Sequence, residues 1–337
     1  MLALQKQRYQ GGEKYLNAFG MMKLLSPLKK NEEYAWLANV SNGTLQTICR
    51  DLDKAYSKFF NKTSNLPKFK NRKRSKPSFP VRADRFYLVN NTAHIQMIGK
   101  VIYRTNYDLP QGREHKFLNP RISYVGGKWL LTFGMERENQ APVLTDQFMG
   151  IDLGIKDLAT VSFGQEKIVY HNINKSRKIR QLERKRRHMQ RIADRRRKGS
   201  KRKTKADDQV ARIYRRQANI RQDYRHQTTK ALVNLLPRRV AMEDLNVSGM
   251  MKNRYLARAI AEQGFDEFIR QMHYKCKWYG IEFIQVPRFY PSSKTCSSCG
   301  NIKRNLKLKD RTYVCEICGL TIDRDFNAAL NLQRYNG

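Results

Sequence analysis

The spacing of apolar residues over the first fifth of the chain is typical of helices. Up to about residue 63, apolar positions recur every three or four residues, as in Leu45, Ile48, Leu52 and Tyr56. This interval places them on one face of an amphipathic helix. We therefore expect a small helical module over residues 1–65.

Alternating apolar and polar positions follow from about residue 80 to 145. Segments 85–89 and 94–98 are joined by Asn90 and Asn91, and a second pair flanks Gly126 and Gly127. Two glycines readily supply the positive φ angles of a two-residue hairpin. Just before, residues 67–80 mix basic residues with Phe69 and Phe79 without any period. We expect a basic arm and a β-rich domain over residues 66–145.

Residues 146–337 predict a mixed α/β domain. Strand patterns at 148–163, 167–170, 238–245 and 281–286 alternate with helical patterns at 256–278 and near the C-terminus. The order strand, strand, strand, helix, strand, helix, strand, helix is that of an RNase H-like α/β fold with insertions.

One insertion, residues 174–230, is strongly basic. Residues 175–225 hold 22 Lys or Arg and five acids, on two helical patterns that break at Gly199 and Ser200. Like charges one turn apart destabilise a helix unless a polyanion neutralises them. We therefore expect a basic helical hairpin that binds nucleic acid. The alternative is that the basic residues form a solvated helix face.

Charge and composition narrow the class of partner. The chain carries 67 Lys or Arg against 29 Asp or Glu, a formal charge of +38, which favours nucleic acid. We find no long apolar run and no secretion signal, so we expect a soluble intracellular protein without a membrane partner or small-molecule substrate. Our candidate nucleic-acid contacts are Lys68, Lys70, Arg72, Lys73, Arg74, Arg184, Lys185, Arg186, Arg187, Arg195, Arg196, Arg197, Lys198, Lys201, Arg202 and Lys203.

Four cysteines have the spacing of a zinc site. Cys296 and Cys299 are followed after fifteen residues by Cys315 and Cys318, so each CxxC pair would bind one side of a tetrahedral Zn²⁺. Such a closed Cys₄ site is structural, and we expect a zinc ribbon over residues 290–322 that is inserted in the α/β domain. The alternatives are two disulfides or a redox pair, and we expect Cys49 and Cys276 to be buried thiols.

Three acids are candidates for a catalytic magnesium site. Asp152 lies between Gly150 and Gly154, whose missing side chains would admit a nucleic-acid backbone; Glu243 ends an apolar strand; and Asp325 begins the last helix. Carboxylates from separate segments that converge on two Mg²⁺ ions can cleave phosphodiesters. Each acid also has a purely structural alternative: Asp152 could be a turn residue, Glu243 an ion-pair partner and Asp325 an N-cap. Asp323 is an alternative to Asp325 as the third catalytic acid.

Four motifs occur in order and resemble the TnpB family, the transposon-encoded relatives of type V CRISPR effectors. They are GIDLGIKD from residue 150, EDLNVSGM from 243, PSSKTCSSCG from 291 and CGLTIDRDFNAA from 318. The resemblance implies an RNA-guided endonuclease with a RuvC-like site of Asp152, Glu243 and Asp325. It also implies a guide RNA from the transposon end, and cleavage of double-stranded DNA beside a short transposon-adjacent motif.

The resemblance sets further expectations. The protein would act in the prokaryotic cytoplasm and lie on the nucleoid when bound to DNA. Family members usually begin with a wedge-domain strand ahead of the helical recognition module, whereas this chain begins inside or just ahead of that module, so residues 80–145 alone would form the wedge. Rival functions are a cleavage-inactive guided repressor and a guide-independent RNase H-like transposase or resolvase.

Overall fold

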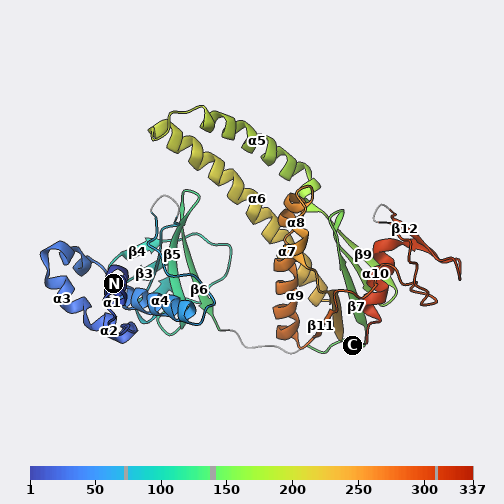
Figure 1. The fold of residues 1–337 in the computed structure, drawn as a ribbon, viewed down its shortest axis with the longest axis horizontal. Coiled ribbons are helices and arrows are strands. Elements are labelled where there is room, and N and C mark those ends of the chain that lie inside the picture. Colours follow the sequence, from blue (N-terminus) through green and yellow to red (C-terminus); the bar gives the residue numbers. More distant parts are fainter. Residues whose placement is uncertain (72–74, 137–141, 308–309, 337) are drawn as a thin grey trace. The chain divides into compact units, whose positions relative to one another are not determined.

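The computed structural model describes residues 1–71, 75–136, 142–307 and 310–336. The chain forms two compact units, Met1–Arg137 and Glu138–Gly337 (Figure 1). Three of the predicted nucleic-acid contacts, Arg72, Lys73 and Arg74, lie outside the described residues. A search of the described helices finds none with the length and apolar character needed to cross a membrane.

The first unit begins with the helical module that the apolar spacing predicts. It contains α1 (Leu2–Gln10), α2 (Ala18–Lys23), α3 (Leu25–Lys30), the 3-10 helix η1 (Glu32–Asn39) and α4 (Asn42–Phe60). Leu45, Cys49 and Tyr56 are buried on one face of α4. The Thr44 hydroxyl donates to the Pro80 carbonyl at 3.0 Å, so the module is joined to the strands that follow.

Two three-stranded sheets make up the rest of this unit. One has the order β1-β5-β6 (Ser78–Pro80, Phe117–Val125, Lys128–Met135), and the other β2-β3-β4 (Phe86–Val89, Thr92–Ile95, Gly99–Ile102). Gly126 and Gly127, with φ of 56° and 78°, form the predicted β5–β6 hairpin turn. A short 3-10 turn, η2 (Ala83–Arg85), lies between the two sheets in sequence.

Two details of the sequence prediction for this unit are wrong. The predicted strand 94–98 is instead Thr92–Ile95, because Met97 adopts a positive φ of 68° in the turn to β4. The last three residues of the predicted arm form β1, since Phe79 pairs with Ile122 of β5. Such long-range pairing leaves no periodic signal in a segment of three residues.

The second unit is built on a five-stranded mixed sheet of order β11-β10-β7-β8-β9. Its strands are β7 (Phe148–Leu153), β8 (Asp157–Phe163), β9 (Glu166–His171), β10 (Arg239–Glu243) and β11 (Glu282–Val286). Strands β7, β10 and β11 are parallel, while β8 and β9 are antiparallel to their neighbours. This is the α/β arrangement that the predicted element order required.

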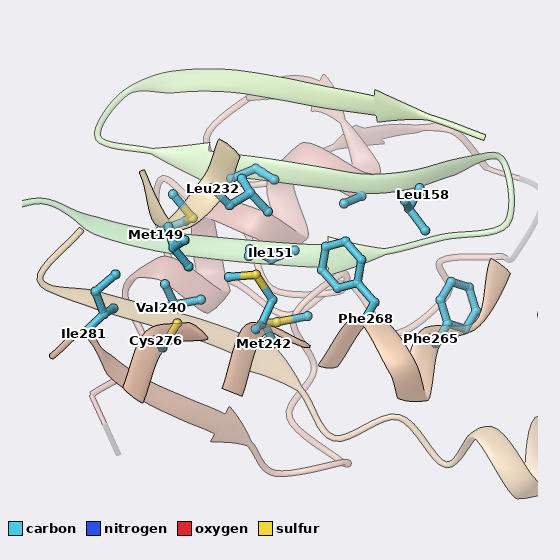
Figure 2. Packing of buried hydrophobic residues seen from close by; sticks show 14 of the residues in the cluster. Met149, Ile151, Leu158, Leu232, Val240, Met242, Phe265, Phe268, Cys276 and Ile281 are labelled. Carbon is cyan, nitrogen blue, oxygen red and sulfur yellow. The ribbon is translucent and has the colours of Figure 1, made fainter. Parts of the chain in front are cut away.

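The two faces of this sheet have different coverings. Met149, Ile151, Val240 and Met242 point into the main core with side chains from α6, α8 and α9 (Figure 2). The residues between them in sequence point the other way, because side chains alternate along a strand. There, α10 (Arg324–Gln333) packs against β7 and β8, and Ala241 meets Leu332.

Helices connect these strands largely as expected. The predicted basic hairpin consists of α5 (Arg177–Asp194) and α6 (Lys201–Val233), after the short η3 (Ile173–Lys175). The single helical stretch predicted at 256–278 is instead two helices, α8 (Ala257–Gln263) and α9 (Phe265–Tyr279), preceded by the one-turn α7 (Val247–Met250). Gly264 separates them because its φ of 67° is left-handed and ends α8.

Candidate nuclease and zinc sites

Asp152 and Glu243 lie on one face of the sheet, on neighbouring parallel strands. In β7, Gly150 and Asp152 alternate with the core residue Ile151, and in β10, Glu243 follows the core residue Met242. The register pairs Met242 with Ile151, so the next residue of each strand is a candidate acid. Both carboxylates therefore point toward the face that α10 covers.

The third candidate, Asp325, reaches the same place because α10 lies directly on Gly150. A Cβ atom on Gly150 would come 1.9 Å from the Ala329 carbonyl oxygen, so only glycine permits this approach. Four residues of helix rise about 6 Å, and two residues of strand span about 7 Å. The distance along α10 from Ala329 back to Asp325 is therefore similar to the distance along β7 from Gly150 to Asp152. Because Ala329 lies on Gly150, Asp325 comes close to Asp152.

This geometry corrects the role that we assigned to Gly150. We expected Gly150 and Gly154 to leave room for a nucleic-acid backbone. In the structure Gly150 is filled by helix backbone, and a Cβ on Gly154 would lie 3.1 Å from the Asp157 carbonyl oxygen in the β7–β8 turn. Gly150 is therefore required by the protein's own packing, whereas a Cβ on Gly154 would only need the Asp157 carbonyl to shift slightly.

The electrostatics show that Glu243 and Asp325 both act on Asp152. Burial raises the pKa of Asp152 well above its usual value, and the charges of Glu243 and Asp325 raise it further, against the opposing effect of Arg324. Burial also raises the pKa of Glu243. Arg324 offsets only part of the effect of these carboxylates on Asp152, and a bound divalent ion would relieve the rest.

Asp323 and Asp325 have different surroundings. Asp323 is the N-cap of α10: its carboxylate accepts from the Phe326 N–H at 3.0 Å and lies 3.2 Å from the Lys167 ammonium. Burial raises the pKa of Asp323, but these two partners outweigh it and hold the pKa below its usual value. Asp325 is therefore not the N-cap, and its carboxylate pairs with Arg324 at 3.1 Å.

A buried serine that the sequence reasoning missed contacts Glu243. The Ser292 hydroxyl donates to the Glu243 carboxylate, and the Ser292 carbonyl accepts from the Asn331 side chain at 2.7 Å. Asn327, one turn earlier, donates to the Thr295 carbonyl and accepts from the Ser297 N–H. Asn327 and Asn331, at i and i+4 on α10, join the segment that precedes the cysteines to the acid site. This pair of asparagines was the sequence signal from which the contact could have been predicted.

The four cysteines form the second candidate site. Their sulfurs all lie within 4.8 Å of one another, and Cys296–Cys318 and Cys299–Cys315 are each 3.6 Å apart. Tetrahedral zinc with Zn–S bonds of 2.3 Å needs sulfurs about 3.8 Å apart, so the set fits zinc. All six cysteines are free thiols, which excludes the disulfide alternative in this structure, and Cys49 and Cys276 are buried as predicted.

Backbone geometry around the cysteines favours thiolates. Gly300 and Gly319, at φ of 76° and 68°, end the two CxxC turns. The N–H groups of Cys318 and Ile317 point at the Cys315 sulfur and lower its pKa to about 6. Strands β12 (Thr312–Val314) and β13 (Thr321–Asp323) support the second pair and lead directly into α10. Within the described residues, these four cysteines are the only group of three or more possible metal ligands whose ligand atoms lie as close together as those of a metal site. The carboxylates of the three candidate acids are spaced more widely.

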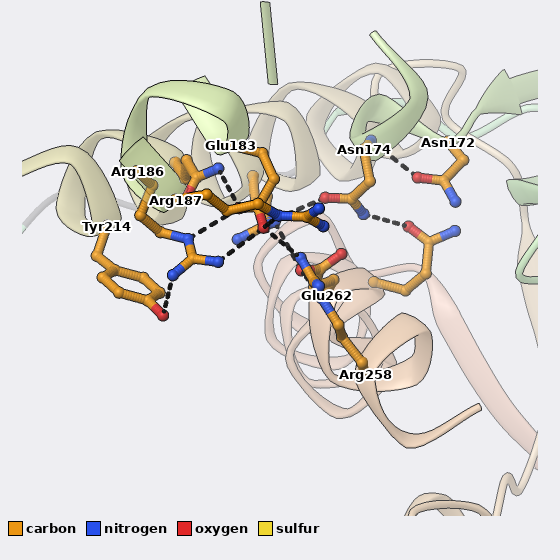
Figure 3. A network of polar contacts seen from close by, with 11 residues as sticks. Asn172, Asn174, Glu183, Arg186, Arg187, Tyr214, Arg258 and Glu262 are labelled. Carbon is orange, nitrogen blue, oxygen red and sulfur yellow. Dashed lines mark hydrogen bonds and ion pairs between the residues drawn. The ribbon is translucent and has the colours of Figure 1, made fainter. Parts of the chain in front are cut away.

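The basic hairpin has an internal anchor of its own. The Glu183 carboxylate accepts from Arg186 at 2.7 Å, from Arg187 at 3.1 Å and from Arg258 of α8 at 3.0 Å (Figure 3). Arg186 also donates to the Tyr214 hydroxyl and stacks over its ring. Arg186 is therefore held within the protein, whereas most of the other predicted hairpin contacts, including Arg195–Lys198, are exposed. Lys68 and Lys70 of the first unit are exposed as well.

Comparisons with known proteins agree with this arrangement. A protein of Streptomyces pristinaespiralis, named as a candidate RNA-guided DNA endonuclease, is 34% identical over 309 residues, covering 91% of this chain and 75% of its own. Escherichia coli K12 InsQ, named likewise, is 30% identical and is covered over 83% of its length. The OrfB_IS605 profile, described as a probable transposase, matches residues 132–254, and the Cas12f1-like TNB domain matches 265–332.

The chain belongs to the TnpB family. A solved Cas12f1 chain, from a complex with sgRNA and target DNA, superposes over 99% of this chain and 82% of its own, with a TM-score of 0.57 and 15% identity. At that identity the likeness concerns the fold. The TnpB chain thus has a Cas12f-like mixed α/β fold, with an OrfB, RuvC-like region and a Cys₄ TNB module.

Proposed function

We propose that this protein is an RNA-guided DNA endonuclease of an insertion sequence, and that it cleaves double-stranded DNA beside a short transposon-adjacent motif. The observation that carries the proposal is the convergence of Asp152, Glu243 and Asp325 from β7, β10 and α10. The names of its relatives and their shared family support the guided activity.

In this proposal the three acids hold Mg²⁺, two ions in all. Their mutual repulsion and burial suit a site for hard divalent cations with oxygen ligands. Bound there, magnesium supplies activation of the attacking water and stabilisation of the leaving oxygen. The chain's own task is to hold the carboxylates in place, since Ser292 fixes Glu243 and the packing of α10 on Gly150, at Ala329, positions the helix that carries Asp325.

The other parts of the chain receive roles consistent with their surfaces. We assign residues 1–65 to recognition, 66–145 to the wedge and 146–337 to the nuclease. The exposed hairpin cations would contact nucleic-acid phosphates, and the Cys₄ module would hold structural zinc. Arg324 beside Asp325 is a cation within the acid site.

Purification of the RNA that the protein carries tests the guided part of the proposal. The protein would be expressed together with its downstream flanking DNA and purified at high salt, because +38 charges retain RNA nonspecifically at low salt. One dominant RNA that ends in sequence beyond the element is expected. A diffuse population, or none, would instead favour a guide-independent transposase or resolvase. A bound guide without Mg²⁺-dependent nicking would favour a repressor.

A further inference from the structure

The turn that follows β11 displays an aromatic side chain beside the acid site. Phe289 is 93% exposed, the highest value among the large apolar side chains of the described residues. It is the third residue of a tight turn, because the Tyr290 N–H donates to the Pro287 carbonyl at 2.9 Å. The register pairs Glu243 with Val286, the last residues of the parallel strands β10 and β11. The turn therefore begins at the sheet edge that carries Glu243.

Arg288, which precedes Phe289, attaches the turn to the residue after Glu243. The Arg288 guanidinium donates to the Asp244 carboxylate at 2.7 Å and to the Asp244 carbonyl at 3.3 Å. The Asp244 N–H in turn donates to the Val286 carbonyl at 3.0 Å. The first half of the turn is thus held against the end of β10.

The residues after Phe289 attach the other half. Tyr290 is half-buried in the small core with Leu332, and its ring centre lies 5.1 Å from that of Tyr335. Ser292 is buried and donates to the Glu243 carboxylate. Three residues of chain span at most about 10 Å, so the Cα atoms of Phe289 and Ser292 lie no farther apart. Phe289 is therefore exposed between two attachments to the acid site.

This placement suits the ring for a contact with substrate. Single exposed apolar side chains are common on protein surfaces and by themselves indicate nothing. Here the backbone on both sides of Phe289 is held, so binding through the ring would cost little additional ordering. A flat apolar ring can stack on the face of any nucleobase, whatever its sequence. A strand whose phosphate lies at the acids would have a neighbouring base within reach of this ring.

We propose that Phe289 stacks on a base of the DNA strand whose phosphate lies at the acid site, and so positions that strand for cleavage. This substrate contact rests on the proposed function, which makes DNA the substrate. Both faces of a base inside a duplex are covered by neighbouring bases, so the contact favours an unpaired strand.

The test uses the full-length protein and a single-stranded DNA heptamer with one central 5-iodo-2′-deoxyuridine, at high salt and with Ca²⁺ in place of Mg²⁺ to prevent cutting. Crosslinks formed in light are mapped by mass spectrometry. We expect a crosslink at Phe289 that needs Ca²⁺, because a cation at the acids holds the adjacent phosphate. The Ca²⁺-dependent part of binding, measured by fluorescence anisotropy, separates the acid site from the basic hairpin.

Variants separate stacking from apolar bulk. Phe289→Ala should weaken the Ca²⁺-dependent binding about tenfold, the effect of losing one stacked aromatic. Phe289→Leu should weaken it similarly, because leucine is apolar but not flat, and Phe289→Trp should retain it. Trp278→Ala is the matched control and should change nothing, since Trp278 is an exposed aromatic near the end of α9, which precedes the opposite end of β11.

Four outcomes would overturn the proposal. They are crosslinks confined to other segments, unchanged binding by Phe289→Ala, full binding by Phe289→Leu, and crosslinking at Phe289 by the matching RNA heptamer alone. A loss in Trp278→Ala equal to that in Phe289→Ala would have the same meaning.

This result is distinguishable from the outcome for guided cleavage. Should the heptamer stack on Phe289 while the protein neither retains a guide nor cuts DNA, the contact stands and the guided nuclease fails. Guided cutting by a protein whose Phe289 variants bind the heptamer normally would have the opposite meaning.

Discussion

Asp152 is held in an environment that opposes its own charge. Burial and two neighbouring carboxylates raise its pKa in the folded protein above the unfolded value near 3.8. A carboxyl whose pKa is raised on folding makes the metal-free protein less stable as pH rises from the unfolded to the folded pKa. The acid site therefore destabilises the metal-free protein, and a bound cation would offset this destabilisation.

Neutralising this residue should therefore stabilise the metal-free protein. We expect Asp152→Asn to raise the thermal midpoint at pH 7 by on the order of a few degrees, and to lose that advantage near pH 4. Calorimetry in a chelator measures both. Added Mg²⁺ should raise the midpoint of the unmodified protein and leave the variant nearly unchanged. Destabilisation by Asp152→Asn at pH 7 would contradict the description of the site.

Ser292 should matter to the metal site through Glu243. Removing its hydroxyl in Ser292→Ala should raise the Mg²⁺ concentration for half-maximal cleavage about 10- to 100-fold, the usual effect of losing a hydrogen bond to a ligand. Direct Mn²⁺ binding, followed by electron paramagnetic resonance, should weaken in parallel. The neighbouring Ser293→Ala is the control, and an equal effect there would argue for general loss of structure.

At the scale of elements, α10 joins the two candidate sites. Its Asn327 and Asn331 hold the segment around Cys296, its first turn carries Asp325, and its middle lies on β7. Displacement of this helix would disturb the acids and the cysteines together.

Gly150→Ala tests that contact. The added Cβ would overlap the Ala329 carbonyl, so we expect a loss of about 1–3 kcal/mol in unfolding free energy and reduced cleavage. Denaturant titration measures the loss. Gly11→Ala is the control, because its Cβ would meet nothing nearer than 3.5 Å at a negative φ. Unchanged stability of Gly150→Ala would show that α10 does not lie on β7 as described.

The anchor at Glu183 gives an element-scale prediction with a pH signature. Hydrogen bonds from its arginine partners, of which Arg186 has the largest effect, hold the pKa of Glu183 well below its usual value. The contribution of Glu183 to folding stability is therefore present above about pH 4.5 and is lost as pH falls. Glu183→Gln should cost about 1–3 kcal/mol at pH 7 and much less in acid. Asp208→Asn, which removes another hairpin acid, should have little effect. Equal losses at both pH values would contradict the ion-pair account.

How far the sequence predicted these features depended on whether the signal was local. The Cys₄ set, the Gly126–Gly127 turn and the hairpin break at Gly199–Ser200 are local signals, and the structure confirms them. The pairing of β1, the break at Gly264 and the contact of Ser292 with Glu243 depend on residues distant in sequence or on backbone torsion. Periodicity carries no information about these.

At the scale of the whole molecule, the basic surfaces and the acid site are complementary. The +38 charge attracts nucleic acid without reading its sequence, whereas the three acids form one small negative site on the α/β unit. In the proposed function a guide supplies the sequence information and the acid site supplies the chemistry. The membership in the TnpB family makes this division the natural one to test.

The most direct measurement compares cutting by the purified protein–RNA complex with cutting by its Asp152→Ala variant. The substrate is a plasmid that matches the guide and carries a randomised flank. Our account predicts Mg²⁺-dependent double-strand breaks beside a defined flanking motif, no breaks with the variant, and the same RNA bound to both. Continued cutting by Asp152→Ala would contradict the assignment of the catalytic site.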